Sequence, residues 1–395
     1  MMRRVYLDNN ATTPLLQEVL EAMQPYFGEH FGNASSIHHH GQETRAAIER
    51  ARESAATLLG CRASEVVFTS GGTEADNLAI FGLAQAGDHV ITSTIEHHAV
   101  LNACKHLAKY RGKAGCEVTC IPVDGRGLVD PEDVKRAIRP NTKLITVMFA
   151  NNETGVVQPV EEIGKIAAEA NVYFHTDAVQ AAGKIAVDVK KIGCDLLTIS
   201  GHKIHGPQGV GALYVRKGTA LAAMLYGGSH ERSRRAGTEN VPAIVGLGKA
   251  AELASAGFER GDDTKMAAAR DRLERELLSI EATGLNGGSN GEVALRVPNT
   301  TNIYFDGIEG ESLIIALDLK GLAVSTGAAC SSGAIEPSHV LTAMGLRSDR
   351  AKASIRFSLG KQNTAEDIEF ALAIVPETVS RLRELSPVYR TVVSK

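Results

Sequence analysis

The feature that most limits the possible folds is an alternation between short apolar runs and longer segments with helical periodicity. The runs at 65–70, 88–94 and 143–150 each precede a segment with the pattern of a helix. Two more runs, at 172–178 and 195–200, continue the series. Strands that alternate with helices predict a mostly parallel sheet with helices on both of its faces. Ligands of such sheets bind beyond the carboxyl ends of the strands, so functional residues are expected there.

A second, smaller domain is predicted after a shift in composition around 257–275, where a break precedes a long, charged helical segment. Its expected strands are 300–307 and 354–360, and its expected helices are 312–321 and 364–385. This mixture is typical of the α+β class.

Composition and net charge narrow the class of protein. The chain has 395 residues, of which 44% are hydrophobic and 22% are charged, as is typical of a globular enzyme. A net charge of −4 gives no reason to expect a nucleic-acid partner or binding to an anionic membrane. No apolar run approaches the ~20 residues of a membrane span, and none follows the two initial arginines as in a secretory signal.

The cysteines give no pattern of a disulfide framework or of a metal site. They stand at positions 61, 104, 116, 120, 194 and 330, and no two of them form a C-x-x-C pair. In a chain of this length without a secretory signal, they predict reduced thiols and a cytoplasmic location.

The segment "FTSGGTEADNLAI" (68–80) reads as a strand, a glycine-rich turn and a helix. Gly71 and Gly72 would let the backbone approach a ligand closely. Thr73 is expected to cap the helix, whose free N–H groups would form an anion site. A plain strand-to-helix turn is the alternative, since the spacings of the P-loop and of the dinucleotide fingerprint are both absent.

Polar residues follow two of the predicted strands. The strand predicted within the run at 172–178 ends on Asp177, and Gln180 follows about one helical turn later, so both side chains can reach one ligand. Lys203 lies in a glycine-rich segment just after the run at 195–200. The simpler interpretation is a turn aspartate and a solvated surface lysine. The alternative is a carboxylate that pairs with a protonated ring nitrogen, and an amine that bonds to a carbonyl group.

Two segments rich in histidine raise the question of a metal site. Glu96, His97 and His98 follow the run at 88–94, but the H-E-x-x-H spacing of zinc enzymes is absent. The histidines at 38–40 are adjacent, and three adjacent side chains cannot share one face of a helix. We expect a loop at 38–40 that is solvated or near a phosphate, and a metal-binding module remains an alternative.

Several of these features together match the needs of one cofactor. Pyridoxal phosphate requires an anion site, a partner for its pyridinium nitrogen and a lysine that reacts with its aldehyde. The glycine turn at 71–73, Asp177, the flat ring of His97 and Lys203 would supply them. Burial and positive neighbours would lower the pKa of the Lys203 amine and make it a nucleophile.

Motifs from residue 6 to residue 360 carry a resemblance to one enzyme family. They are "YLDNNATTPL" (6–15), "FGNASSIH" (31–38), "SGGTEADNLAI" (70–80), "EHHAV" (96–100), "NNETGVVQP" (151–159), "HTDAVQAAGK" (175–184), "SGHKIHGPQGVGALYV" (200–215), "RAGTENV" (235–241), "STGAACSSG" (325–333) and "IRFSLG" (355–360). With these motifs the chain resembles the cysteine desulfurases of the NifS/IscS type, within the class V aminotransferase-like enzymes.

The resemblance implies a PLP-dependent transferase of fold type I, an α/β fold whose large domain contains a mostly parallel seven-stranded sheet. It places the large, cofactor-binding domain at 15–262. It forms the small α+β domain from both termini, 1–14 and 263–395.

The resemblance also implies a role for each matching residue. Lys203 would form the Schiff base with the cofactor, and His97 would stack on the ring and move protons. Asn152 and Arg356 would bind the substrate carboxylate, which the fork of a guanidinium fits in two parallel bonds. The remaining cofactor contacts would be Asp177 at the pyridinium nitrogen, Gln180 at the phenolic oxygen, Gly72, Thr73, Ser200 and His202 at the phosphate, Thr238 reaching in from a second subunit, and Asn152.

Cys330 distinguishes this family from a generic transaminase. It is the only one of the cysteines that lies in a run of small residues, the segment 325–333. From composition alone, an incidental thiol in a linker is the simpler interpretation. The resemblance implies instead a catalytic thiol that keeps the sulfur of L-cysteine as a persulfide while L-alanine departs.

The resemblance further implies a cytoplasmic homodimer that passes sulfur to an iron–sulfur scaffold protein or to another sulfur acceptor, such as a tRNA-thiolation protein. No metal is expected in the resting enzyme, although Cys330 would transiently ligate a cluster during transfer. The alternatives on the same fold are a selenocysteine lyase and a transaminase of small amino acids. A non-catalytic sulfur carrier is a third alternative, and loss of Lys203 or Asp177 would be its signature.

Overall fold

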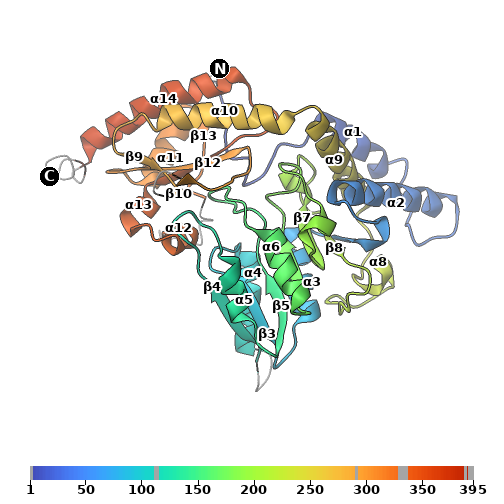
Figure 1. The fold of residues 1–395 in the computed structure, drawn as a ribbon. Coiled ribbons are helices and arrows are strands. Elements are labelled where there is room, and N and C mark those ends of the chain that lie inside the picture. The colour runs from blue at the N-terminus through green and yellow to red at the C-terminus, as the bar shows by residue number, and fades with distance from the viewer. Residues whose placement is uncertain (1–2, 111–114, 290–291, 328–336, 387–388, 390–395) are drawn as a thin grey trace.

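The computed structural model of the protein describes residues 3–110, 115–289, 292–327, 337–386 and 389. Figure 1 shows a large part around a central sheet and a smaller part, at the upper left, that contains the C-terminal helices. The sequence prediction of an α/β fold with a mostly parallel seven-stranded sheet is confirmed.

The central sheet has seven strands, which are β2 (Val66–Thr69), β3 (His89–Ser93), β4 (Glu117–Ile121), β5 (Thr142–Thr146), β6 (Tyr173–Asp177), β7 (Leu196–Ser200) and β8 (Gly211–Val215). Their order is β2-β8-β7-β6-β5-β3-β4. Neighbours from β7 to β4 are parallel, whereas β8 is antiparallel to both β7 and β2. The five parallel strands therefore end at one edge of the sheet.

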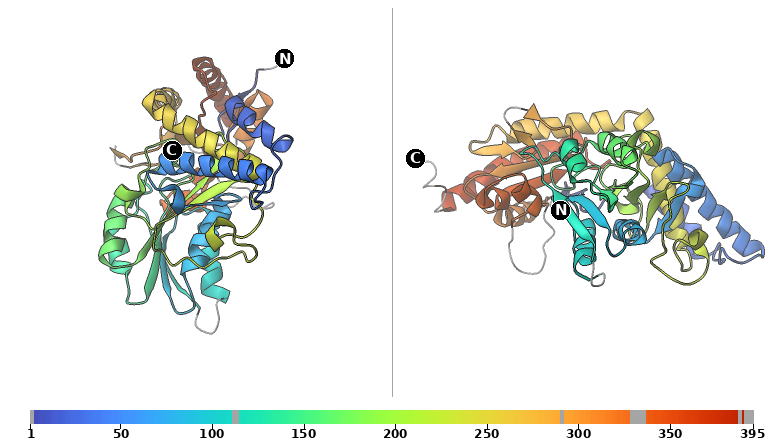
Figure 2. Two further views of the ribbon diagram at one scale, coloured as in Figure 1. Left: turned by 90° about the vertical axis from the view of Figure 1, so that its right-hand side faces the viewer. Right: turned by 60° about the horizontal axis from the view of Figure 1, so that its bottom comes forward.

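Helices cover both faces of this sheet. One face is covered by α2 (His39–Leu59), α6 (Val160–Glu169) and α9 (Val241–Glu259), and the other by α3 (Gly72–Leu83) and α4 (His98–Tyr110). Successive strand residues point to opposite faces, so Val66 and Phe68 belong to the first core and Val67 to the second. The two long helices α2 and α9 run side by side (Figures 1 and 2).

The smaller part combines both ends of the chain. Strand β1 (Val5–Tyr6) pairs in parallel with β13 (Leu322–Ala323). An antiparallel sheet contains β14 (Ser354–Ser358), β12 (Thr300–Phe305) and β9 (Thr283–Leu285). It packs against the helices α10 (Asp262–Leu277), α11 (Gly310–Leu319) and α14 (Ala365–Leu385). Helix α10 lies beside α14 in Figure 1. The domain boundaries 1–14, 15–262 and 263–395 stay a proposal, which is supported by the shared core of Val5 and Leu7 with the C-terminal elements.

The remaining elements are short. They are α1 (Gln17–Met23), α5 (Pro131–Ala137), α7 (Val189–Ile192), α8 (His230–Ser233), α12 (His339–Ala343), α13 (Ser348–Lys352), the 3₁₀ turns η1 (Gln24–Phe27), η2 (Ala63–Glu65) and η3 (Gly201–Lys203), and the hairpin of β10 (Gly288–Ser289) and β11 (Glu292–Val293).

The loop predicted at 38–40 is wrong, because helix α2 begins at His39. His38 is the N-cap of the helix, and its Nδ1 accepts a hydrogen bond from the N–H of Gly41 at 3.3 Å. The described part of the chain holds no group of three or more His, Cys, Asp or Glu side chains placed to bind a metal ion. Over the same residues, no helix is both long enough and apolar enough to span a bilayer.

Candidate active site

A cavity of about 430 Å³ lies at the carboxyl ends of the central strands. Asp177 is the last residue of β6, Ser200 is the last residue of β7, and Lys203 lies in the turn η3 that follows β7. The strand ends thus bring these three side chains to one cavity. The other residues assigned to the site from the sequence that also line it are Gly72, Thr73, His97, Asn152, Gln180, His202 and Arg356.

The amine of Lys203 is held by the N-terminal segment. Its Nζ donates to the backbone oxygens of Asn10 at 2.6 Å and Ala11 at 2.7 Å. The pKa of Lys203 is lowered to about 8, first by burial and then by the guanidinium of Arg356, while the charge of Asp177 opposes the shift. A fraction of the amine is therefore neutral near pH 7, as a nucleophile or a base requires.

Two buried carboxyl groups, those of Asp177 and Asp76, line the same cavity. Oδ1 of Asp177 accepts from the N–H of Val179 at 2.9 Å, whereas Oδ1 of Asp76 has no hydrogen-bond partner in the parts of the chain that the structure describes. Burial raises the pKa of Asp177 to about 6, and burial with the neighbouring Asp177 charge raises the pKa of Asp76 well above its usual value. A protonated ring nitrogen beside Asp177 would therefore be stabilised by a carboxylate that lacks a bonded cation.

The glycine turn after β2 leads into helix α3, whose first two residues, Gly72 and Thr73, line the cavity. The helix begins at Gly72 with Gly71 as its N-cap, so the prediction that Thr73 caps it is wrong. The carboxylate of Glu74 instead reaches back to the N–H of Ser70 at 2.8 Å. N–H groups in the first turn of a helix have no acceptor within the helix, so this end can bind an anion such as a phosphate.

Two histidines of the cavity carry neutral rings near pH 7. Burial and the charge of Lys203 lower the pKa of both His97 and His202 to about 4. Nδ1 of His97 accepts from the N–H of Ala99 at 3.2 Å, so Nε2 carries the hydrogen of the neutral ring. His97 thus offers a flat neutral ring with one N–H donor.

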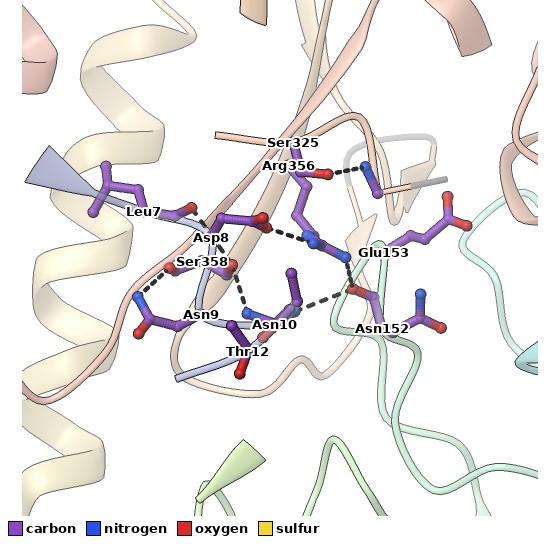
Figure 3. Close-up of polar contacts among 12 residues, drawn as sticks. Leu7, Asp8, Asn9, Asn10, Thr12, Asn152, Glu153, Ser325, Arg356 and Ser358 are labelled. Atoms are coloured by element: carbon purple, nitrogen blue, oxygen red, sulfur yellow. Dashed lines mark hydrogen bonds and ion pairs between the residues drawn. The ribbon is translucent and has the colours of Figure 1, made fainter. Parts of the chain in front are cut away.

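The guanidinium of Arg356 is fixed by residues from distant parts of the chain (Figure 3). It donates to Oδ1 of Asp8 at 2.6 Å and to the backbone oxygen of Asn152 at 2.9 Å. Its buried Nε has no hydrogen-bond partner among the described residues. The side chain of Asn10 donates to the same Asn152 oxygen at 3.1 Å, which ties the N-terminal segment to the site.

Sequence reasoning missed several residues of the cavity, although most of them belong to the motifs quoted above. Asn10 stands in the motif 6–15 and Asp76 in the motif 70–80, but neither has a partner nearby in the sequence that reveals its role. The further residues that line the cavity are Ala11, His98, Met148, Ala150, Glu153, Val179, Ser325, Gly327 and His339.

Two assigned residues do not appear at this cavity. Cys330 lies outside the described residues. Thr238 is exposed and does not line the cavity of its own chain, so its role stays a prediction. The segment before Thr238 is anchored by a buried ion pair, in which the guanidinium of Arg52 donates to both carboxylate oxygens of Glu231 at 2.7 and 2.9 Å.

Comparisons with known proteins identify relatives along nearly the whole chain. Residues 5–370 match the family model described as aminotransferase class-V. The chain is 53% identical to the cysteine desulfurase IscS of Methanosarcina thermophila, over 98% of this chain and 96% of that protein. A solved NifS-like protein superposes with a TM-score of 0.86 at 37% identity, over 96% of this chain and all (100%) of that one. A solved complex of SspA with cysteine gives a TM-score of 0.76 at 38% identity, over 90% of this chain and 98% of that one.

Proposed function

The chain belongs to the class V aminotransferase family, and we propose that it is a cysteine desulfurase that converts L-cysteine into L-alanine. Lys203, Asp177 and Arg356 line one cavity, and this arrangement carries the proposal. The relatives named cysteine desulfurase and the SspA–cysteine complex support L-cysteine as the substrate.

Class V aminotransferases and cysteine desulfurases depend on pyridoxal phosphate, and the residues of this cavity fit that cofactor. The buried carboxyl of Asp177 would pair with the ring nitrogen, and Lys203 would hold the aldehyde carbon. The first turn of α3, with Gly72 and Thr73, would hold the phosphate. When bound, the cofactor supplies an electron sink for the bond broken at the α-carbon of the substrate.

The chain's own groups would bind the substrate and move its protons. Arg356, together with Asn152, would bind the substrate carboxylate, since both residues line the cavity. With a pKa of about 8, Nζ of Lys203 can accept the α-proton and release it again. The neutral ring of His97 would stack on the cofactor and move protons, with Nε2–H as its donor.

We assign the sulfur-accepting thiol to Cys330, which lies outside the described residues. Its thiolate would attack the sulfur of the substrate, so that one sulfur atom moves from L-cysteine to a persulfide and L-alanine is left. The other five cysteines support this assignment because none of them lines the cavity. Burial also raises the pKa of the thiols of Cys61 and Cys104, which keeps them protonated.

The direct test is to incubate the purified protein, loaded with pyridoxal phosphate, with L-cysteine and a thiol reductant. Alanine and sulfide should form in equal amounts. The variant Lys203→Ala should lose both the yellow colour of the bound cofactor and turnover, whereas Lys361→Ala, which changes a half-buried lysine outside this cavity, should keep both. Unchanged colour and turnover in Lys203→Ala would end the assignment.

A second experiment separates the desulfurase from related activities. The variant Cys330→Ser should bind the cofactor but form no persulfide, as measured by mass spectrometry of the intact protein after cysteine is added. A requirement for a keto acid, without dependence on Cys330, would identify a transaminase. Alanine formed from selenocysteine but not from cysteine would identify a selenocysteine lyase.

We further propose a cytoplasmic homodimer that hands sulfur to an iron–sulfur scaffold or another acceptor protein. The five cysteines in the described residues are all free, which supports a reducing compartment. Thr238 is exposed on its own chain, which supports a role in the cofactor site of a second subunit. Cross-linking between the Thr238 segment and the partner cavity, in the cofactor-loaded protein, tests this arrangement.

A further inference from the structure

Lys184 is a buried lysine whose only hydrogen-bond partners, within the described part of the chain, are two amide oxygens. The residue is 8% exposed, and Nζ donates to Oδ1 of Asn10 at 2.9 Å and to Oε1 of Gln180. Over the described residues, no carboxylate lies within ion-pair distance of this amine. Burial, with the cations Lys203 and Arg356 nearby, lowers its pKa well below the usual value. A buried amine without a counter-ion is unfavourable for stability, so its position calls for another reason.

The contacts of Lys184 fix the orientation of the Gln180 amide. Nζ of Lys184 donates to this amide's oxygen, and it has hydrogens to donate whether the amine is charged or neutral. On the opposite side, Nε2 of Gln180 donates to the backbone oxygen of Asn10 at 3.0 Å, and this oxygen can only accept. A flipped amide would place oxygen against oxygen and nitrogen against nitrogen.

The partner amide of Asn10 is oriented independently. Its Nδ2 donates to the backbone oxygen of Asn152 at 3.1 Å and to Oγ1 of Thr300 at 2.8 Å. Its Oδ1 therefore faces Lys184, and it also accepts from Asn299 at 3.0 Å. The amine of Lys184 thus lies between two amides whose oxygens both point toward it.

One hydrogen of the Gln180 amide remains free for a ligand. Nε2 carries two hydrogens, and its only acceptor among the described residues is the Asn10 oxygen. Gln180 lines the cavity, and the same Asn10 oxygen accepts from Nζ of Lys203 at 2.6 Å. The second N–H of Gln180 therefore belongs to the same polar network as the amine of Lys203, which is assigned to the aldehyde of the cofactor.

We propose that Lys184 is a positioning residue, which fixes the Gln180 amide so that its free N–H donates to the phenolic oxygen of pyridoxal phosphate. The proposal rests on the proposed function, because it needs that cofactor in the cavity. Lys184 itself would touch neither the cofactor nor the substrate.

The test is the variant Lys184→Met, which keeps an unbranched side chain of similar length and removes the donors. Without a fixed donor, negative charge at the phenolic oxygen is less stabilised, so the bound chromophore should hold its proton more tightly. We expect the pH midpoint of the visible absorbance of the bound cofactor to rise by about one pH unit and its dissociation constant to increase about tenfold. The melting temperature of the apoprotein should stay within about 3 °C, because removal of a buried amine without a counter-ion offsets the loss of its two hydrogen bonds.

A double-mutant cycle separates positioning from simple loss of a charge. In the Gln180→Met background, the amide is already absent, so Lys184→Met should cause no further shift of the midpoint. The charged or titratable groups that act on Lys184 or feel its charge are Lys203, Arg356 and His205, and they are the same in both backgrounds. An equal shift in both backgrounds would mean that Lys184 acts as a charge, and the proposal would be overturned.

The matched control is Lys361→Met. Lys361 is half-buried and donates to the backbone oxygen of Leu253 at 3.3 Å, without contact to Gln180. Its loss should leave the midpoint and the cofactor affinity unchanged. No change of either quantity in Lys184→Met would overturn the positioning role alone, whereas a wild-type protein that retains no pyridoxal phosphate would overturn the proposed function as well.

Discussion

Arg356, which lines the cavity, forms an ion pair of 2.6 Å with Asp8, so the arginine assigned to the substrate carboxylate already holds a carboxylate of the protein. Asp8 reaches this position because its backbone bridges in parallel to Ser358, two residues after Arg356 on β14 (Figure 3). A bound substrate carboxylate must therefore share the guanidinium with Asp8.

The variant Asp8→Asn keeps an oxygen acceptor for Arg356 but removes the negative charge. The substrate carboxylate is then no longer repelled, so we expect the KM for L-cysteine to fall about threefold, or ~0.6 kcal/mol. Steady-state kinetics at constant ionic strength measure this change. Asp306→Asn, which removes the partner of Arg350 outside the cavity, is the control and should leave KM unchanged. A rise in KM for Asp8→Asn would contradict the prediction.

The lowered pKa of Lys203 predicts how the apoprotein reacts with pyridoxal phosphate at different pH. Only the neutral amine attacks the aldehyde, so the rate of recombination should rise almost tenfold per pH unit below the pKa of about 8 and level off above it. The reaction can be followed by stopped-flow absorbance between about pH 6.5 and pH 9, a range that extends about one pH unit or more to each side of that pKa.

The variant Arg356→Gln tests the cause of this pH dependence. The guanidinium lowers the pKa of Lys203, so its removal should raise that pKa and move the rate profile to higher pH. A profile that stays in place or moves to lower pH would show that Arg356 does not act on the amine.

The buried ion pair of Arg52 and Glu231 should be important for stability. Glu231 also accepts from the N–H of Phe68 at 2.9 Å, so Glu231→Ala would remove the acceptor of this N–H and the buried counter-ion of Arg52, which would keep only half-exposed Glu49 and the backbone oxygen of Val66. We expect the free energy of unfolding in urea to fall by about 3–5 kcal/mol. The double variant Arg52→Met/Glu231→Met should cost less than Glu231→Ala, because no buried charge is left unpaired. A loss below about 1 kcal/mol for Glu231→Ala would contradict the assignment.

Gly164 allows helix α6 to approach the C-terminal end of α7. A Cβ atom at this position would lie 1.9 Å from the backbone oxygen of Ile192, which cannot rotate away. Gly164→Ala should therefore lower the free energy of unfolding by about 2–4 kcal/mol. Gly28→Ala is the matched control, since its Cβ would meet nothing within 4 Å, and the two variants should differ clearly in urea denaturation.

Local patterns in the sequence predicted the central elements well. The runs at 65–70 and 195–200 are β2 and β7, because buried parallel strands are short and continuously apolar. The antiparallel direction of β8 could also be predicted from the sequence, since the connection 201–210 between β7 and β8 is too short for a crossover between parallel strands.

The start of helix α2 could not be predicted from local sequence patterns in the same way. Adjacent histidines at 38–40 resemble a loop, and the buried face of the helix is built largely from small residues such as Ala47, Ala51 and Ala55. Small side chains give a weak periodic signal, and this face becomes recognisable only when it packs against α9.

The sequence by itself determined the order of strands and helices, the strand-end positions of Asp177 and Lys203, and the family to which the motifs belong. Only the tertiary structure decided that Asp8 pairs with Arg356, 348 residues away, and that Lys184 donates to Asn10, 174 residues away. Strand and helix formation depend on neighbours within a few residues, whereas these contacts depend on how the N-terminal segment packs between the two parts of the molecule.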